Sequence, residues 1–124
     1  MSTLEVSTAK VTNLNDGTTT LATTFVTNGS AKAWLKVTKA SDTINDSFSV
    51  TSITDVATGK TTVTSAITFG NQNGSLLGTN NQGSTDLGVY VNWSSTTTWV
   101  VYTKDSGGSF TDRDFSSVIH GDLA

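Results

Sequence analysis

Small hydroxyl side chains dominate this sequence and constrain its fold more than any other feature. Thr occupies 25 positions and Ser 16, so 41 of the 124 residues carry a hydroxyl group. Thr is β-branched, and its side chain packs well on the pleated surface of a strand but gains little in a helix. Residues that favour helices are scarce, with a single Met and a single Glu. The composition therefore predicts an all-β protein.

Charge and cysteine content exclude several classes of protein. Charged residues make up only 14% of the chain, and the net charge is −3. The seven basic residues are scattered, which argues against nucleic acid as a partner. The absence of Cys excludes disulfides and thiolate metal sites. No apolar run approaches the roughly 20 residues of a membrane span, so we expect no membrane insertion.

Residues 1–30 form a region with few large apolar side chains. Leu4 and Val6 alternate with polar residues, as in a strand, and residues 15–17 (Asn-Asp-Gly) predict a turn. Residues 18–27 then predict a second strand. Two strands with so little apolar area are not stable alone, so we expect this β arm to pack on the rest of the chain or on another subunit.

Alternation is clearer after residue 30. In residues 31–37, Ala33, Leu35 and Val37 fall on one face, whereas Trp34 falls on the other with its neighbouring lysines. Residues 47–55 and 61–69 predict a hairpin with its turn near Gly59. Ile53 departs from the alternation, which indicates a bulge or a strand buried on both faces.

The remaining segments alternate between strands and loops. Residues 87–93, 97–103 and 115–121 predict three more strands. Residues 70–86, rich in Gly, Asn and Gln, predict a long irregular loop that only two leucines interrupt, and residues 104–114 predict another. The chain thus has about eight predicted short strands and no predicted helix, which indicates an antiparallel β-sandwich or small barrel over residues 31–124 with an extended N-terminal arm.

The sequence offers little for catalysis or metal binding. His120 is the only imidazole, and a catalytic triad would need a Ser and a carboxylate beside it. With 16 Ser and 10 acidic residues such neighbours arise from composition alone, so we expect no enzymatic activity and no cofactor. Asp105, Asp112 and Asp114 suggest either a Ca²⁺ loop or a solvated turn, without the spacing of an EF-hand. His120 is either an ordinary packed residue or one of three imidazoles around a metal on a threefold axis.

Aromatic side chains suggest either a core or a binding surface. Tyr90, Trp93, Trp99 and Tyr102 lie in two adjacent predicted strands, where they suit a hydrophobic core or a platform that stacks on a sugar ring. Trp34 lies opposite the apolar face of its own strand. Burial against a neighbouring subunit or a two-sided core would each account for it.

Part of the sequence resembles a known family. The run Ala31, Lys32, Ala33, Trp34 is followed by residues 46–55 (Asp-Ser-Phe-Ser-Val-Thr-Ser-Ile-Thr-Asp), a turn at Gly59, a Thr/Val-rich returning strand and an ending at residues 121–122 (Gly-Asp). This pattern resembles a recurring C-terminal domain of bacteriophage tail-fibre and tail-spike-like proteins, over about residues 29–124.

The resemblance implies a virion structural protein, a homotrimeric tail fibre or knob that contacts other virion proteins and attaches to host-surface polysaccharide. Residues 1–30 would dock on the virion or join the trimer, and residues 31–124 would form the fibre tip. The N-terminal residues lack the apolar core of a signal peptide, so we expect synthesis in the host cytoplasm and location in the virion. The alternatives are a carbohydrate-binding module and a head fibre or decoration protein that binds capsid.

Two sets of residues follow as candidates. The candidate subunit interface consists of apolar side chains without a partner in their own region: Trp34, Val6, Val11, Leu14, Leu21 and Phe25. The candidate receptor contacts are polar loop residues able to hydrogen-bond to sugar hydroxyls: Asn71, Gln72, Asn73, Asn80, Asn81, Gln82, Asp105, Ser109 and Asp112.

Overall fold

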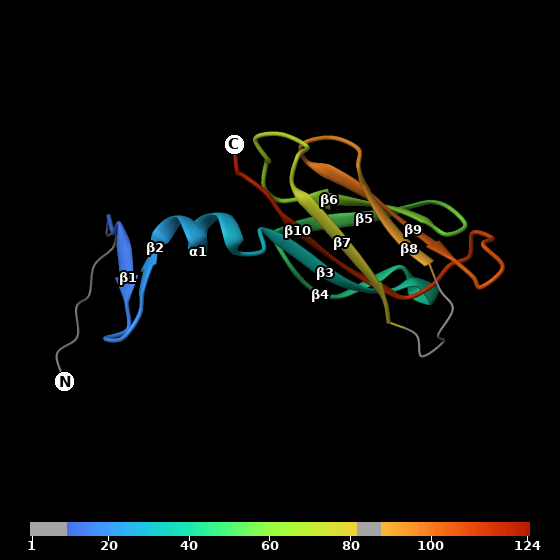
Figure 1. The fold of residues 1–124 in the computed structure, drawn as a ribbon. Coiled ribbons are helices and arrows are strands. Elements are labelled where there is room, and N and C mark those ends of the chain that lie inside the picture. The colour runs from blue at the N-terminus through green and yellow to red at the C-terminus, as the bar shows by residue number, and fades with distance from the viewer. Residues whose placement is uncertain (1–9, 82–87) are drawn as a thin grey trace. The chain divides into compact units, whose positions relative to one another are not determined.

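The computed structural model describes residues 10–81 and 88–124, so the predicted strand around Leu4 and Val6 lies outside the described residues. The chain forms two compact units, residues 1–30 and residues 31–124 (Figure 1). The described residues contain no helix long and apolar enough to cross a membrane.

The N-terminal unit consists of a short hairpin and a short helix. Strands β1 (Asn13–Asn15) and β2 (Thr20–Ala22) pair antiparallel, with Leu14 opposite Leu21. The turn between them is the predicted one. Gly17 has φ of +95°, and the Asp16 carboxylate accepts hydrogen bonds from the backbone N–H groups of Thr18 and Thr19, at 2.9 and 2.7 Å.

The prediction of a continuous strand over residues 18–27 is wrong, because helix α1 (Thr23–Gly29) follows β2 directly. Threonine hydroxyls of the helix form hydrogen bonds that strand propensity does not capture. The Thr23 hydroxyl contacts the carbonyl oxygens of Val11 and Thr12, at 2.9 and 3.0 Å, where the chain enters β1. The Thr27 hydroxyl donates back to the carbonyl of Thr23 at 3.2 Å, within the helix.

The second unit is an antiparallel β-sandwich. One four-stranded sheet has the order β4-β3-β10-β7 and the other β5-β6-β9-β8. The strands of the first are β3 (Ala33–Thr38), β4 (Thr43–Phe48), β7 (Ser75–Asn80) and β10 (Phe115–His120). Those of the second are β5 (Val50–Ala57), β6 (Lys60–Ser65), β8 (Gly88–Trp93) and β9 (Thr98–Lys104). The predicted all-β antiparallel fold is confirmed, with ten strands in the described residues rather than about eight.

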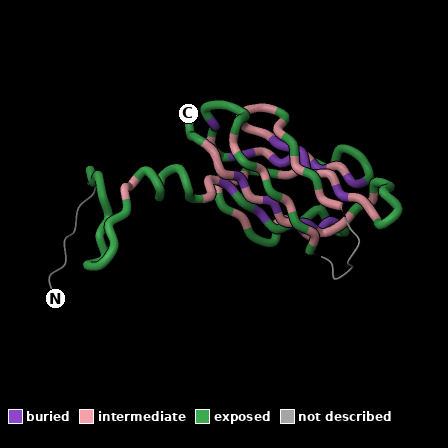
Figure 2. Tube along the Cα trace, in the orientation of Figure 1, coloured by how far each residue is buried: buried purple, intermediate pink, exposed green. Residues whose placement is uncertain are grey.

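Side chains from both sheets meet in one core. Figure 2 shows where the buried residues lie along the strands of this unit. Ala33, Leu35 and Val37 are buried, as their alternation predicts, and they face a set from the second sheet that includes Trp99. The Trp99 side chain is fully buried, and its indole N–H donates to the Ser117 hydroxyl at 3.1 Å. The buried indole N–H of Trp99 therefore has its hydrogen-bond partner on the opposite sheet.

The predicted strand over residues 47–55 is in fact two strands in different sheets. The chain leaves β4 at Phe48 and enters β5 at Val50, and Ser49 between them has φ of +56°. The irregularity predicted near Ile53 is present as a register shift between Val50 and Ser52. The hairpin of β5 and β6, with Gly59 in its turn at φ of +65°, is confirmed.

The prediction of an irregular loop over residues 70–86 is also wrong in part. Strand β7 pairs with β10 along its whole length, from Ser75 opposite His120 to Asn80 opposite Phe115. Gly78 lies where a Cβ would stand 2.6 Å from a methyl of Val91, so this Gly permits the close approach of β7 and β8. The Gly at position 78 is therefore explained by the close packing of two strands and not by a loop.

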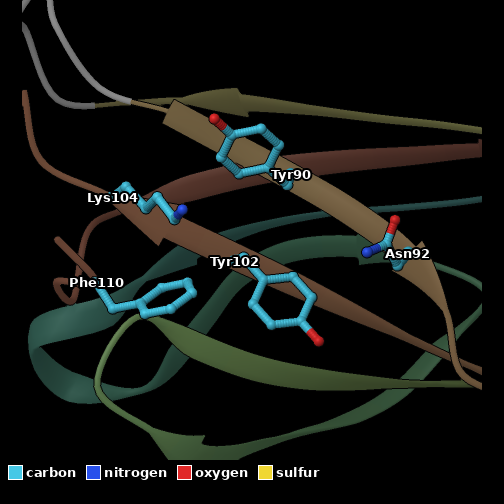
Figure 3. Close-up of a pocket in the computed structure, with 5 residues that line it drawn as sticks. All are labelled: Tyr90, Asn92, Tyr102, Lys104 and Phe110. Atoms are coloured by element: carbon cyan, nitrogen blue, oxygen red, sulfur yellow. The ribbon is translucent and has the colours of Figure 1, made fainter. Parts of the chain in front are cut away.

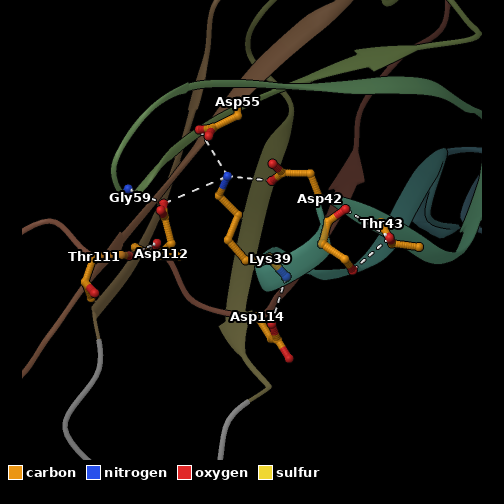
Figure 4. Close-up of polar contacts among 10 residues, drawn as sticks. Lys39, Asp42, Thr43, Asp55, Gly59, Thr111, Asp112 and Asp114 are labelled. Atoms are coloured by element: carbon orange, nitrogen blue, oxygen red, sulfur yellow. Dashed lines mark hydrogen bonds and ion pairs between the residues drawn. The ribbon is translucent and has the colours of Figure 1, made fainter.

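A buried lysine contacts carboxylates from three segments of the sandwich (Figure 4). Lys39 lies in the 3₁₀ helix η1 (Lys39–Ser41), and its ammonium is 2.6 Å from a carboxylate oxygen of Asp42 and 3.0 Å from one of Asp55. Asp112 lies farther away, at 3.9 Å, and also accepts the backbone N–H of Gly59 at 2.7 Å. Burial lowers the pKa of Lys39, but the hydrogen bonds to Asp42 and Asp55 outweigh it and hold that pKa above its usual value.

Candidate functional site

A shallow hollow on the outer face of the second sheet gathers exposed aromatic side chains (Figure 3). It has a volume of about 240 Å³ and is lined by five residues, here called the aromatic patch: Tyr90, Asn92, Tyr102, Lys104 and Phe110. Tyr90 and Phe110 are each about half exposed, at 54% and 51%. Exposed aromatic side chains that converge with polar groups are typical of ligand-binding surfaces.

Strands β8 and β9 place most of the patch. Val89, Val91 and Trp93 pack against the core, so Tyr90 and Asn92, which alternate with them, point outward. On β9, Trp99, Val101 and Thr103 are buried, and Tyr102 takes the outer face. The register sets Tyr90 directly opposite Tyr102, so the two rings are cross-strand neighbours.

The loop after β9 supplies Phe110. Asp105 closes a tight turn, because its carboxylate accepts the N–H of Ser109 at 2.9 Å and its own N–H donates to the Ser109 carbonyl, also at 2.9 Å. An antiparallel bridge then sets Phe110 opposite Lys104. The Phe110 ring lies 6.0 Å from the Tyr102 ring, centroid to centroid, at an interplanar angle of 44°. The turn thus brings a third ring to the pair on the sheet.

Two lysine ammonium groups lie over these rings. Nζ of Lys104 is 5.3 Å from the centre of the Tyr90 ring and 4.8 Å from that of Phe110. Nζ of Lys60 is 5.7 Å from the centre of the Tyr102 ring, beside a second hollow of about 230 Å³ that Tyr102 and Phe110 also line. Among the residues that the structure describes, neither Lys60 nor Lys104 has a carboxylate oxygen within 4.0 Å of its ammonium.

The predicted receptor contacts do not form one surface. Asn71, Gln72 and Asn73 precede β7 at one end of the sandwich, and Asn80 and Asn81 lie at the opposite end (Figure 1). Asp105, Ser109 and Asp112 share the second end, because β9 finishes there, and Gln82 lies outside the described residues.

Several of these side chains already have hydrogen-bond partners. Asn71 accepts the N–H of Asn73 at 2.8 Å, and the Asn81 amide donates to the Ser116 hydroxyl at 2.8 Å. Asp105 holds the turn before Phe110, and Asp112 holds Gly59. Among the described candidates, Asp105 and Ser109 are the ones related to the aromatic patch, because their hydrogen bonds form the turn that positions Phe110.

The candidate interface residues fall into two places. Val11, Leu14, Leu21 and Phe25 are exposed in the N-terminal unit, and Val6 lies outside the described residues. Trp34 is 37% exposed on the outer face of the first sheet. The pairing registers set it in an apolar row that crosses all four strands of that sheet: Phe48, Trp34, Val118 and Leu77.

The acidic residues of the suggested Ca²⁺ loop have separate roles. Each carboxylate accepts a hydrogen bond from a different backbone N–H group. Asp105 accepts from Ser109, Asp112 accepts from Gly59, and Asp114 accepts from Lys39 at 2.8 Å. His120 ends β10, opposite Ser75. Across residues 10–81 and 88–124, no three His, Asp or Glu side chains gather as metal ligands.

Sequence reasoning named Tyr90 and Tyr102 but grouped them with Trp93 and Trp99, which belong to the core side of the same strands. It missed Asn92, Lys104, Lys60 and Phe110. Strict alternation along residues 88–93 and 98–104 would have predicted that Asn92 and Lys104 lie on the outer face.

Comparison with protein-family models, curated proteins and solved structures found no match.

Proposed function

We propose that this protein is a non-enzymatic attachment protein that assembles through its N-terminal unit and binds polysaccharide with its sandwich. The resemblance to phage tail-fibre domains supports a homotrimeric virion fibre or knob that attaches to host-surface glycans and contacts other virion proteins. The observation that carries the proposal is the exposure of every large apolar side chain in residues 10–30.

The described part of the N-terminal unit, residues 10–30, has no buried core. From residue 10 to residue 30, no residue is buried. Five large apolar side chains in this short stretch are at least 40% exposed: Val11, Leu14, Leu21, Phe25 and Val26. A two-stranded hairpin and a seven-residue helix are each marginal in water without packing. Contact with the same unit of other copies would bury these side chains and stabilise the hairpin and helix together.

The sandwich supports the attachment half of the proposal. Tyrosine and phenylalanine faces offer apolar area against which the C–H face of a sugar ring stacks, and they lose little side-chain entropy. One shallow hollow of about 240 Å³ gives weak binding, but three copies on a trimer bind a repetitive polysaccharide through avidity.

The assembly is tested by sedimentation of the full chain and of a triple variant, Leu14→Ser, Leu21→Ser and Phe25→Ser. We expect a trimer for the unmodified chain at micromolar concentration and a monomer for the variant. Val56→Ser is the matched control, because Val56 is 51% exposed but lies in the sandwich. A monomeric unmodified chain would show that the exposed side chains do not serve self-assembly.

A carbohydrate-binding module is the second candidate, and the aromatic patch favours it as much as the first. Such a module need not be oligomeric. A monomer that binds polysaccharide, and loses binding when Tyr102 is replaced by Ala, would support this candidate over the fibre.

A further inference from the structure

We propose that the aromatic patch selects acidic polysaccharides, binding a uronic-acid unit with its ring on the aromatic faces and its carboxylate at Lys104, while Lys60 adds positive charge in the adjoining hollow. This inference rests on the proposed polysaccharide-binding function and names the class of glycan that the patch takes.

The rings provide a surface of the right kind for one sugar unit. Tyr90 and Tyr102 are cross-strand partners, and Phe110 extends the surface beyond Tyr102. The hollow of about 240 Å³ is smaller than the roughly 300–1,000 Å³ of pockets that enclose a small molecule. An open site of this size suits one unit of a long chain that continues on both sides.

The charges at the patch point to an anionic ligand. Of the seven basic residues in a chain with net charge −3, two place their ammonium groups over the rings of this one surface. The described residues that line its two hollows include both lysines and no Asp or Glu. The described lining is therefore positive, opposite in sign to the net charge of the whole protein, and a carboxylate on the ligand would be its counter-ion.

Neighbouring aromatic rings hold the Lys104 ammonium at the patch. This ammonium lies within 5.3 Å of two ring centres, Tyr90 and Phe110, from two different segments of the chain. Cation–π attraction holds the charge at the ring surface without neutralising it. A ligand carboxylate there would form a charge-assisted hydrogen bond, which is stronger than a bond to a neutral hydroxyl.

Asn92 adds a neutral polar group at the far side of Tyr90 (Figure 3). Its side-chain amide has both donor and acceptor atoms, which match the hydroxyl groups of a sugar. Single-stranded nucleic acid also combines rings with negative charge, but its phosphates repeat at every nucleotide and call for a longer basic groove. Two lysines on one short surface favour a polyuronate.

Titration calorimetry of the full chain tests the inference with five probes: oligogalacturonate, oligomannuronate, the carboxyl-reduced neutral form of each, and oligo(dT). We expect at least one acidic oligomer to bind about tenfold more tightly than its own neutral form, and to weaken with salt. Lys104→Met should remove most of that difference, because the affinity for the acidic oligomer should fall more than the affinity for its neutral form. Lys36→Met, an exposed lysine on the outer face of the other sheet, is the control and should change neither.

The outcomes separate this inference from the function on which it rests. Equal affinity for acidic and neutral oligomers would overturn the selectivity and leave polysaccharide binding intact. Failure of every sugar probe would overturn both, and tighter binding of oligo(dT) would replace a glycan with nucleic acid. If Lys104→Met does not fold, the salt dependence measured on the unmodified chain tests the selectivity instead. Added salt should lower the affinity for the acidic oligomer and leave the affinity for its neutral form unchanged.

Discussion

Replacing Lys39 with Met should destabilise the sandwich more than any other loss of a single charge in the described residues. Met retains most of the apolar stem of lysine and removes only the ammonium. The Lys39 side chain is 3% exposed, whereas the three carboxylates around it are each nearly half exposed. The substitution therefore leaves three carboxylates close together, still in contact with water but without their shared cation.

The magnitude follows from that half-buried geometry. Exposed ion pairs contribute about 0.2–1 kcal/mol, and breaking a fully buried one costs about 3–5 kcal/mol. With two contacts at 2.6 and 3.0 Å and partners that keep part of their hydration, we expect a loss of roughly 2–3 kcal/mol. For a unit of this size such a loss lowers the melting temperature by about 10 °C.

Urea denaturation at matched protein concentration measures this loss, since self-association would otherwise shift the midpoint. Lys36→Met is the control, because Lys36 is exposed on the outer face of β3 and should change the free energy of unfolding by less than about 0.5 kcal/mol. An effect of Lys39→Met no larger than that of the control would refute the stabilising role of the buried ammonium.

The same variant predicts a pH dependence. The pKa of Lys39 is higher in the folded protein than in the unfolded chain, where lysine titrates near 10.4. The stabilisation by its charge is therefore complete below about pH 10 and disappears as the pH rises through the folded pKa. We expect the stability difference between the unmodified chain and Lys39→Met to shrink above pH 10.5, and a constant difference would contradict this.

Three other substitutions test the structure. Gly59→Ala should lower the free energy of unfolding by more than about 2 kcal/mol, because φ there is +65° and the new Cβ would lie 2.7 Å from the backbone N of Thr111. Gly17→Ala is the control: φ there is +95° but the space around it is open, so urea denaturation should show a smaller loss. Trp99→Phe removes the hydrogen bond to the Ser117 hydroxyl and leaves a void, so calorimetry should show a loss of about 2 kcal/mol. Trp34→Ala should shift the sedimenting species from trimer toward monomer without changing the β-sheet circular dichroism, if the apolar row on the first sheet contacts another copy.

The strands that alternate between a buried and a wet face could be predicted from sequence. Ala33, Leu35 and Val37 show the two-residue period directly, because one face of β3 packs on the core and the other meets water. The β5–β6 turn was also predictable, since Gly59 marks a position with positive φ.

Strand β7 and helix α1 could not be predicted because their conformations depend on distant partners. The Gly- and Asn-rich sequence around β7 favours a loop, and pairing with β10 makes it a strand. In α1, the Thr23 hydroxyl donates to the carbonyl of Val11, twelve residues earlier, and local propensity, which assigns this run to a strand, does not include such a contact.

The aromatic residues of β8 and β9 show why core and binding surface were hard to separate from sequence. Both interpretations are partly correct, because alternate residues of the same two strands serve each face. Trp99 and Val101 anchor β9 in the core, and this anchoring fixes the register that sets Tyr102 opposite Tyr90 on the outer face. Alternation predicts that division, whereas the contribution of Phe110 requires the folded turn after Lys104. A rigid core immediately beneath a stacking surface is what a binding site needs, since rings held in place lose little entropy when a ligand stacks on them.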